Sequence, residues 1–205
     1  EWKGMDEFKG RIDHPQTWPE DLDYKGKNVL VIGSGATTAT VVPAIAADCN
    51  HVTVLQRSPT YFIPARNAND LADQLRQLEV DETWIHEITR RKILFDQEMV
   101  TKLSFIDPDG LKKFLLDGVR AIVGDEEVEK NFTPSYRPWQ QRIAFVPNGD
   151  LFHGIKSGKA DVVTDEIERF VPEGVLTRSG KTLKADIIVT ATGFNLSILG
   201  DIRFK

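Results

Sequence analysis

A glycine turn between two apolar strands constrains the fold of this chain more than any other feature. Val29–Ile32 is a continuous apolar run that leads into Gly33-Ser34-Gly35, a helical pattern and a second apolar strand at His51–Gln56. Continuous apolar strands are typical of parallel sheets covered by helices on both faces. The order strand, glycine turn, helix, strand predicts a dinucleotide-binding βαβ unit, with a plain tight turn as the alternative.

The turn carries the residue types that phosphate binding needs. Gly33 permits a tight turn, and Gly35 lets the backbone approach a pyrophosphate without an intervening side chain. The free N–H groups and the positive dipole end of the next helix would point at the phosphates. The sixth fingerprint position is usually Gly or Ala, but here the larger Thr38 has to fit against the sheet. The predicted cofactor-binding residues of this turn are Gly33, Ser34, Gly35, Ala36, Thr37 and Thr38.

The tip of the second strand indicates which dinucleotide is bound. NAD sites usually place an acid there for the ribose 2′-hydroxyl, and this acid would repel a 2′-phosphate. The present chain has Gln56, Arg57 and Ser58 instead. A guanidinium matches phosphate geometry with two parallel hydrogen bonds, so these residues are expected to bind NADP(H). A solvated surface arginine is the alternative.

Composition narrows the function classes. The chain has 205 residues, 40% of them hydrophobic, and a net charge of −5, as in ordinary soluble globular proteins. Nucleic-acid-binding domains usually carry a basic face, so no nucleic-acid partner is expected. No apolar run is long enough to cross a membrane and no signal peptide is visible, so a cytoplasmic location is expected. Cys49 is the one cysteine, and His51, His86 and His153 lack ligand spacing, so no metal site is expected.

The first quarter of the chain divides into a linker and the start of a nucleotide-binding domain. Residues 1–25 are rich in Gly, Pro and Trp, show no sustained period and are predicted to be a linker. Residues 26–64 hold the βαβ unit, the first part of an NADPH-binding domain. Pro43 falls inside its helix and predicts a kink.

The rest of the chain first changes to a helical pattern and then returns to strands. Residues 65–130 carry apolar residues at helical spacing and predict a helical insertion, in which Asp107 caps a helix that begins at Pro108. Residues 131–205 predict a hairpin around Ser179-Gly180 and an apolar strand at Asp186–Phe194, and complete the domain. The expected fold class is therefore α/β, a Rossmann-like, doubly wound NADP-binding domain with a helical insertion.

The linker also carries a longer motif, F-x-G-x-x-x-H-x-x-x-W-P, whose defining positions are Phe8, Gly10, His14, Trp18 and Pro19. It resembles the fingerprint of type I Baeyer–Villiger monooxygenases, flavoproteins related to the flavin-containing monooxygenases. In that family the fingerprint lies just before the NADPH domain. Pro138–Phe152 and Val162–Phe170 are similar to the ethionamide-activating type of FAD-containing monooxygenase. The resemblance covers nearly the whole chain and implies a flavoprotein fold with two dinucleotide-binding domains.

The resemblance implies a mechanism and its cofactors. NADPH reduces FAD, O2 adds to the reduced flavin as a C4a-peroxide, and the peroxide attacks a ketone, an aldehyde or a thioether. An active-site arginine stabilises the anionic adduct. Its place after the Pro138-Trp139 pair makes Arg142 the predicted catalytic residue, with Arg137 as the competing candidate.

The resemblance also implies roles for residues around the cofactors. His14 is expected to order the linker, and Trp18 to anchor it by burying its ring. Thr192 and Gly193 match the return crossing to the flavin domain. Gln141 stands where many relatives have a lysine that contacts the 2′-phosphate, so a milder preference for NADPH over NADH is expected.

One half of such an enzyme is not in this sequence. FAD is expected to be bound mainly by an N-terminal half with its own glycine fingerprint, so the chain is predicted to be a piece of a longer protein and inactive alone. An isolated, non-catalytic NADP-binding module and a pyridine-nucleotide-disulfide-reductase-like domain are the alternatives. The second needs a redox cysteine pair, and the chain has one cysteine. A short-chain dehydrogenase is excluded because no tyrosine is followed by lysine four residues later. Substrate identity and oligomeric state do not follow from the sequence.

Overall fold

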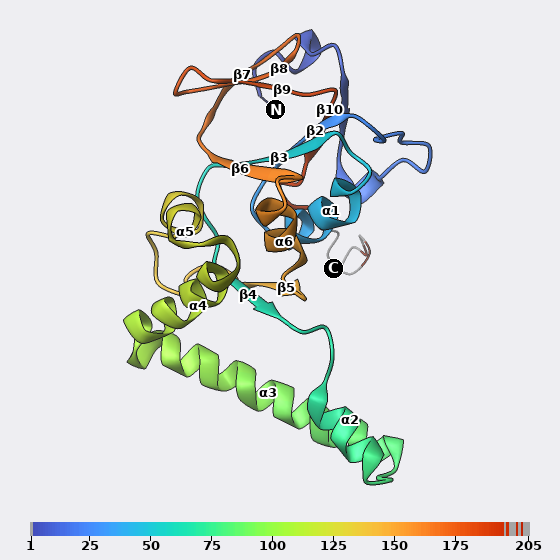
Figure 1. The fold of residues 1–205 in the computed structure, drawn as a ribbon, viewed down its shortest axis with the longest axis vertical. Coiled ribbons are helices and arrows are strands. Elements are labelled where there is room, and N and C mark those ends of the chain that lie inside the picture. The colour runs from blue at the N-terminus through green and yellow to red at the C-terminus, as the bar shows by residue number, and fades with distance from the viewer. Residues whose placement is uncertain (1, 195, 197–199, 201, 203–205) are drawn as a thin grey trace. The chain divides into compact units, whose positions relative to one another are not determined.

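The chain divides into two compact units. The structure, a computed structural model, describes residues 2–194, 196, 200 and 202. The first unit comprises residues 1–57 and 161–205, and the second comprises residues 58–160 (Figure 1). The four-segment division predicted from the sequence remains a prediction. Its outermost parts, at residue 1 and at residues 195, 197–199, 201 and 203–205, lie outside the described residues.

A five-stranded sheet forms the centre of the first unit. Its order is β1 (Arg11–Asp13), β10 (Ile187–Thr190), β2 (Asn28–Ile32), β3 (His51–Gln56) and β6 (Ala160–Thr164). Strands β1, β10, β2 and β3 run parallel, with Ile187 beside Val29 and Val29 beside Val52. Their carboxyl ends therefore meet at one edge of the sheet. The predicted α/β fold with a parallel sheet is confirmed.

Strand β1 lies inside the segment that the sequence predicts as a linker. It has three residues, pairs with β10 at the edge of the sheet, and is flanked by the short 3-10 helices η1 (Met5–Glu7) and η2 (Pro15–Thr17). Three residues are too few to show a period of two. The strand therefore depends on its distant partner, which explains why the local pattern did not reveal it.

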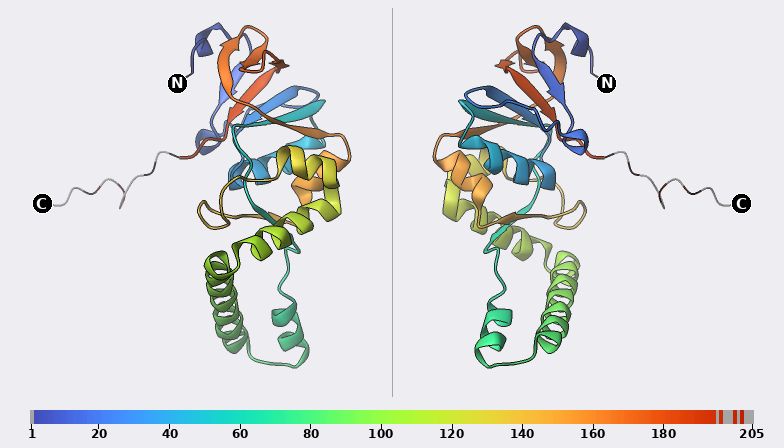
Figure 2. Two further views of the ribbon diagram at one scale, coloured as in Figure 1. Left: turned by 90° about the vertical axis from the view of Figure 1, so that its left-hand side faces the viewer. Right: turned by 90° about the vertical axis from the view of Figure 1, so that its right-hand side faces the viewer.

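Different layers cover the two faces of this sheet. Helix α1 (Ala36–Ala46) continues through Pro43 and packs on β2 and β3 through Ala39, Val42 and Ile45. Figure 2 shows that the other face is covered by the antiparallel strands β7 (Ile167–Val171), β8 (Gly174–Thr177) and β9 (Thr182–Lys184). The expectation of helices on both faces is thus corrected within this unit, because a second sheet can bury an apolar face equally well. The core cluster between the two sheets contains Phe8, Leu30, Ile32, Leu55, Phe170, Val175, Leu183 and Ile188.

Two strand predictions near the end of the chain meet different outcomes. The hairpin around Ser179-Gly180 is confirmed, since it joins β8 to β9 and the Gly180 N–H donates to the Thr177 carbonyl at 2.9 Å. The strand predicted over Asp186–Phe194 is too long, because β10 ends at Thr190. Its apolar run stops being a strand where the chain leaves the sheet edge toward Gly193, which has a positive φ of 107°.

The second unit is mainly helical. Its parallel strands β4 (Phe62–Ala65) and β5 (Ala144–Pro147) lie beside five helices. The helices are α2 (Asp70–Gln77), α3 (Glu82–Ile106), α4 (Pro108–Val123), α5 (Asp125–Asn131) and α6 (Asp150–Lys156). Phe62, Phe132 and Phe152 form a cluster of edge-to-face rings whose centroids are 5.3 to 6.0 Å apart. The predicted cap of α4 is confirmed, because the Gly110 N–H donates to Asp107 Oδ1 at 3.0 Å.

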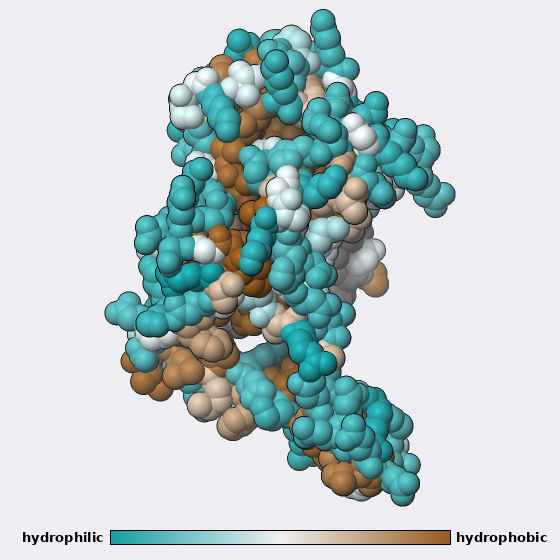
Figure 3. Space-filling model, in the orientation of Figure 1, coloured by the Kyte–Doolittle hydropathy of each residue, from teal (hydrophilic) through white to brown (hydrophobic). Residues whose placement is uncertain are grey.

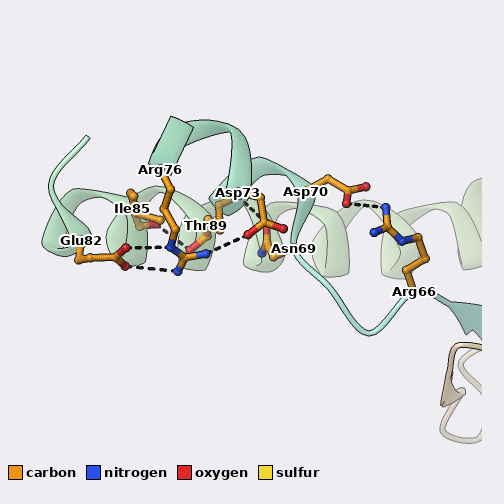
Figure 4. A network of polar contacts seen from close by, with 9 residues as sticks. Arg66, Asn69, Asp70, Asp73, Arg76, Glu82, Ile85 and Thr89 are labelled. Carbon is orange, nitrogen blue, oxygen red and sulfur yellow. Dashed lines mark hydrogen bonds and ion pairs between the residues drawn. The ribbon is translucent and has the colours of Figure 1, made fainter. Parts of the chain in front are cut away.

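Polar contacts join the two helices that project in this unit. Figure 4 shows Arg76 of α2 donating to Glu82 at the start of α3, at 2.8 Å, and to Asp73 at 3.0 Å. Asn69 caps α2 by accepting from the Ala72 N–H. These are exposed ion pairs, so the caps and the packing fix the helix pair more than the charges do. Figure 3 shows apolar side chains over the α3–α4 corner, where Phe105, Ile106 and Phe114 are exposed.

A buried tyrosine should make the second unit sensitive to alkaline pH. Tyr61 is buried and donates to the Tyr136 carbonyl at 2.8 Å; burial, followed by the nearby Tyr136 and Asp109, raises the pKa of Tyr61 from 10.0 to about 12. Between these pH values the unfolded chain loses the proton and the folded chain keeps it, so stability should fall as pH rises through this window. We expect Tyr61→Phe to flatten the dependence of the urea midpoint on pH above 10. An equal slope in Tyr61→Phe and the parent would contradict the assignment.

Candidate functional site

The carboxyl edge of the parallel sheet collects the predicted binding residues of the first unit. From β2 the chain passes through α1 to β3 on one side, while β10 lies on the other side of β2. The crevice between β2 and β10 is thus the topological switch point, where open α/β sheets bind ligands. Gly33 follows β2, Arg57 follows β3, Ala191 follows β10 and His14 follows β1. The parallel register brings these four segments to the same edge.

The two glycines of the turn are needed for different reasons. Gly33 has a φ of 130°, its N–H donates to the Leu55 carbonyl at 2.9 Å, and an added Cβ would lie 2.3 Å from the Ala191 oxygen. Gly35 has ordinary extended angles (φ −87°, ψ −171°), and its Cβ would meet no described atom within 4 Å. The fold therefore requires glycine at position 33. At position 35, glycine leaves open space above the start of the helix.

The start of α1 offers free hydrogen-bond donors. No side chain caps this helix and its first turn contains no acidic residue. The first helical bond runs from the Ala39 N–H to the Gly35 carbonyl at 3.1 Å, so the N–H groups of Ala36, Thr37 and Thr38 precede the intrahelical ladder. Such donors, together with the positive end of the helix dipole, favour an anion at this place.

Thr38 fits against the sheet by using its hydroxyl inside the turn. Its side chain is buried, and Oγ1 donates to the Gly33 carbonyl at 3.0 Å. The extra bulk relative to Gly or Ala is therefore matched by a hydrogen bond that holds the turn. This contact commits the Thr38 side chain to the protein interior and leaves only its backbone N–H for a ligand.

At the tip of β3, a buried polar residue is followed by an exposed charged residue. Gln56 is buried, and its Nε2 donates to Thr164 Oγ1 of β6 at 2.9 Å. Arg57 is exposed, and its guanidinium makes no ion pair with another residue in the described part of the chain. Ser58 is exposed and begins the second unit. Gln56 thus fixes the strand tip, whereas Arg57 keeps its donors available.

A histidine connects the linker motif to the segment after β10. His14 Nδ1 accepts from the Gln16 N–H at 3.1 Å, and Nε2 lies 2.8 Å from the Gly193 carbonyl oxygen. A nitrogen that accepts cannot carry the proton, so the neutral ring is protonated at Nε2 and donates to Gly193. Thr192 and Gly193 are exposed at the sheet edge. The geometry brings two sequence motifs together at a residue that no local pattern connects.

The other linker motif residues serve packing. Phe8 is buried in the core cluster. A Cβ on Gly10 would lie 2.3 Å from the Asp186 carbonyl oxygen, so glycine lets the linker approach the start of β10. Trp18 is half-buried with its ring edge-to-face against Tyr24 at 6.4 Å. The Pro19 carbonyl accepts from the Leu22 N–H at 3.3 Å.

The second unit contains the two arginines that compete for the catalytic role. The Arg137 guanidinium is occupied by contacts within the protein. Its Nη1 donates to the Ser104 carbonyl and to Ser104 Oγ, each at 2.8 Å, and the group lies 4.1 Å from the Phe105 ring centroid. Arg142 is exposed and lines a cavity of about 560 Å³, and Gln141 beside it is also exposed. The contacts of Arg137 favour Arg142 as the residue free for chemistry.

Three residues that matter here were missed from the sequence. Thr164 holds Gln56, Ala191 forms the wall beside Gly33, and Trp139 adopts a positive φ of 63°. Each depends on a partner far along the chain or on a local conformation that few bulky residues adopt. The Pro138-Trp139 pair beside the arginine was the one local signal.

A second cavity lies away from this edge. It encloses about 720 Å³ at the amino ends of β1, β2 and β10. Its charged lining residues are Lys9, Arg11, Lys27 and Lys184 together with Asp21, Asp23, Glu173 and Asp186. With both signs of charge present, this cavity has no clear preference for an anion.

Among the described residues, no three His, Cys, Asp or Glu side chains lie close enough together to hold a metal ion. None of the described helices has the length and apolar character that crossing a membrane requires. Cys49 is buried just beyond α1, where its N–H donates to the Ile45 carbonyl.

Alanine at the two turn glycines should separate their roles. We expect Gly33→Ala to lower the free energy of unfolding by about 1–3 kcal/mol, because of its φ and the clash with Ala191. Gly35→Ala should leave stability unchanged or raise it by about 0.4–1 kcal/mol, since its backbone angles suit alanine. Urea denaturation of both variants measures this. Equal destabilisation would show that the open space at Gly35 is not real.

Two threonines of α1 provide a matched test of the turn. Thr38→Val leaves the partly buried Gly33 carbonyl without its donor, so we expect a loss of about 1–3 kcal/mol in unfolding free energy. Thr40→Val makes the same change at an exposed residue whose hydroxyl bonds within the helix, and it should cost far less. Equal losses in the two variants would exclude a special role for Thr38.

Comparison with known sequences finds relatives that are named FAD-containing monooxygenases. MymA of Mycobacterium tuberculosis is 45% identical over 207 residues, which cover 99% of this chain and 42% of that protein. The FAD-containing monooxygenase EthA of the same species is 46% identical over 199 residues, 96% of this chain and 40% of EthA. The chain thus spans about two fifths of the length of these relatives. No protein-family model matches it.

Solved structures agree with the sequence relatives. A steroid monooxygenase bound to NADP superposes with a TM-score of 0.72 and 25% identity, over 95% of this chain and 44% of that protein. A cyclohexanone monooxygenase from Rhodococcus sp. Phi1 bound to NADP+ has a TM-score of 0.68 at 21% identity, over 95% and 43%, and shows the fold alone. Over the part that it spans, the chain is therefore similar in sequence to proteins named FAD-containing monooxygenases, and it has the fold of the corresponding part of the steroid and cyclohexanone monooxygenases.

Proposed function

We propose that the first unit binds NADP(H) at the carboxyl edge of its sheet. The observation that carries this proposal is an exposed, uncommitted guanidinium at Arg57 on the same edge as an uncapped helix start. The N–H groups of Gly35, Ala36 and Thr37 would hold the pyrophosphate, and Arg57 with Ser58 would hold the 2′-phosphate. The missing Cβ at Gly35 leaves room for that approach. NADP in the related steroid monooxygenase structure supports this assignment.

The other predicted cofactor residues would act indirectly. Thr38 and Gln56 hold the turn and the strand tip through hydrogen bonds to Gly33 and Thr164. His14 would keep Thr192 and Gly193 in place through its bond to the Gly193 carbonyl. Contact of Gln141 with the cofactor remains a prediction, as does a milder preference for NADPH over NADH.

For the whole protein we propose an FAD-dependent monooxygenase. It would use NADPH and O2 to insert one oxygen atom into a ketone or aldehyde, or to oxidise a heteroatom such as sulfur. FAD, when bound, would supply the activation of O2; the one glycine fingerprint of this chain is assigned to NADP(H), so FAD would be held mainly by a further segment. Arg142 would offset negative charge that develops on the substrate, since a guanidinium stays charged at any working pH. The relatives named FAD-containing monooxygenases support this proposal.

Two alternative functions predict different behaviour. An isolated NADP-binding module would bind the nucleotide, but the full-length protein would not consume O2. A disulfide-reductase-like domain would need a redox cysteine pair, whereas this sequence has Cys49 alone, and it is buried. NADPH-dependent O2 uptake by the yellow full-length protein separates these cases. A cytoplasmic location is part of the same proposal.

The nucleotide preference of Arg57 is the direct test. We expect Arg57→Gln to weaken NADP+ binding about 10–100-fold in isothermal titration, because a charge-assisted hydrogen bond to the 2′-phosphate is lost. Binding of NAD+, which lacks that phosphate, should change little.

A matched control excludes a general charge effect. Arg178→Gln removes the same charge from the same unit at the β8–β9 hairpin, where Arg178 pairs with Glu166 at 2.6 Å. It should leave both affinities unchanged. Equal weakening of NADP+ and NAD+ by Arg57→Gln, or the same loss in the control, would contradict the 2′-phosphate assignment.

A further inference from the structure

An apolar stripe runs along one side of α3. Trp84, Phe95 and Ile106 recur every eleven residues, and Ile88 and Met99 repeat the same interval beside them. Eleven residues make about three helical turns, so these side chains share one face of a nearly straight helix. All of them are exposed, with Trp84 at 63%, Phe95 at 57% and Ile106 at 78%. The stripe therefore extends over most of the helix.

The described part of the second unit leaves this stripe uncovered. The side chains that α3 buries belong to Ile85, Thr89 and Ser104, which lie on a different face of the helix. Figure 1 shows the neighbouring helices α2 and α4 beside opposite ends of α3, and both contact it. Extended apolar surface of this kind marks an interaction site more often than isolated exposed residues do.

A row of alternating charges borders the stripe. Its members are Glu87, Arg91, Glu98 and Lys102, whose spacings of four and seven residues place them on one face. Within the helix Arg91 pairs with Glu87 at 2.7 Å, and Lys102 pairs with Glu98 at 2.6 Å. From the start of α3 to its end the signs are negative, positive, negative, positive. Turning the helix end to end inverts this order, so the row is complementary to itself.

The centre of this inversion lies midway between Phe95 and the residue before it. Glu87 and Lys102 are equally far from that point and have opposite charges. The same holds for Arg91 and Glu98. A surface that matches itself after a two-fold rotation is what an isologous contact between two identical chains requires.

The apolar stripe has the same centre. Trp84 and Phe105 are equally far from it, and Phe105 is also exposed. Phe95 lies beside the centre, where it would meet its own counterpart. A lipid surface needs no such symmetry, and α3 carries equal numbers of acidic and basic side chains, so nothing in its charge favours anionic lipids.

We propose that α3 pairs with α3 of a second copy of this chain, in antiparallel orientation, about a two-fold axis beside Phe95. Glu87 then lies opposite Lys102 of the second copy, and Arg91 lies opposite Glu98 of the second copy. A parallel pair in register would bring like charges together. Exposed ion pairs contribute little affinity, so the apolar stripe drives the association and the charges set its direction. This inference is independent of the proposed monooxygenase function.

Sedimentation velocity of the full-length protein over a range of concentrations tests the pairing. We expect the parent to form a dimer. Arg91→Glu and Glu98→Arg each bring like charges together twice in a symmetric pair, so each should raise the dissociation constant about tenfold or more. Arg90→Glu is the matched control, because Arg90 is exposed but adjacent residues of a helix do not share a face. It should leave the dissociation constant unchanged.

Restoring the opposite charges should restore the dimer. In an equal mixture of Arg91→Glu and Glu98→Arg, each acidic position of one copy lies opposite a basic position of the other, so mixed dimers should form with the affinity of the parent. The double variant Arg91→Glu/Glu98→Arg should also pair, although it loses both ion pairs within the helix.

Three results would overturn the proposal. They are a parent that stays monomeric at every concentration, the same loss in Arg90→Glu, and no recovery in either the mixture or the double variant. Flotation of a monomeric parent with phosphatidylcholine vesicles would assign the stripe to a lipid surface instead.

Discussion

The close approach of Gly33 to the end of β10 is the constraint on which the candidate nucleotide site depends. The Gly33 Cα hydrogen faces the Ala191 carbonyl, where a methyl group would lie 2.3 Å from the oxygen. This approach lets β2 and β10 end together at the switch point and starts α1 directly after the turn. The parallel register then brings Arg57 and His14 to the same edge. The absence of a Cβ at Gly33 thus determines where the unpaired N–H groups at the start of α1 are placed.

Polar side chains with distant partners complete that edge. His14 reaches the Gly193 carbonyl, and Gln56 reaches Thr164 on the neighbouring strand. The first contact joins a side chain to the backbone and the second joins two side chains, and each connects separate segments, so neither residue needs to touch a ligand to matter. Arg57 differs because its guanidinium is exposed and uncommitted. The candidate nucleotide site therefore consists of a frame of satisfied polar groups and one available charge.

The second unit uses a similar division of roles between its two arginines. The Arg137 guanidinium hydrogen-bonds to Ser104 and contacts the Phe105 ring. These contacts fix the turn that carries Trp139 and Arg142. A buried or stacked arginine stabilises the scaffold, whereas the exposed arginine five residues later faces a cavity. Sequence proximity alone cannot distinguish these roles, because both residues follow the same aromatic and proline-rich segment. Their hydrogen bonds distinguish them.

Local chemistry was enough to predict the glycine turn, β3, the hairpin at Ser179-Gly180 and the Asp107 cap, since each depends on residues within one turn or strand. The family resemblance rested on the linker motif in the same way. Strand β1 and the sheet that covers the second face did not follow from local patterns, because each depends on a partner distant in the sequence. The hydrogen bond from the Thr38 hydroxyl to the Gly33 carbonyl is local, but it depends on the geometry of the turn. The sequence by itself determined the parallel α/β unit and the residue types that are expected to bind phosphate. Only the tertiary structure decided which polar groups are satisfied and which remain free, because pairing across the fold depends on strand order and register.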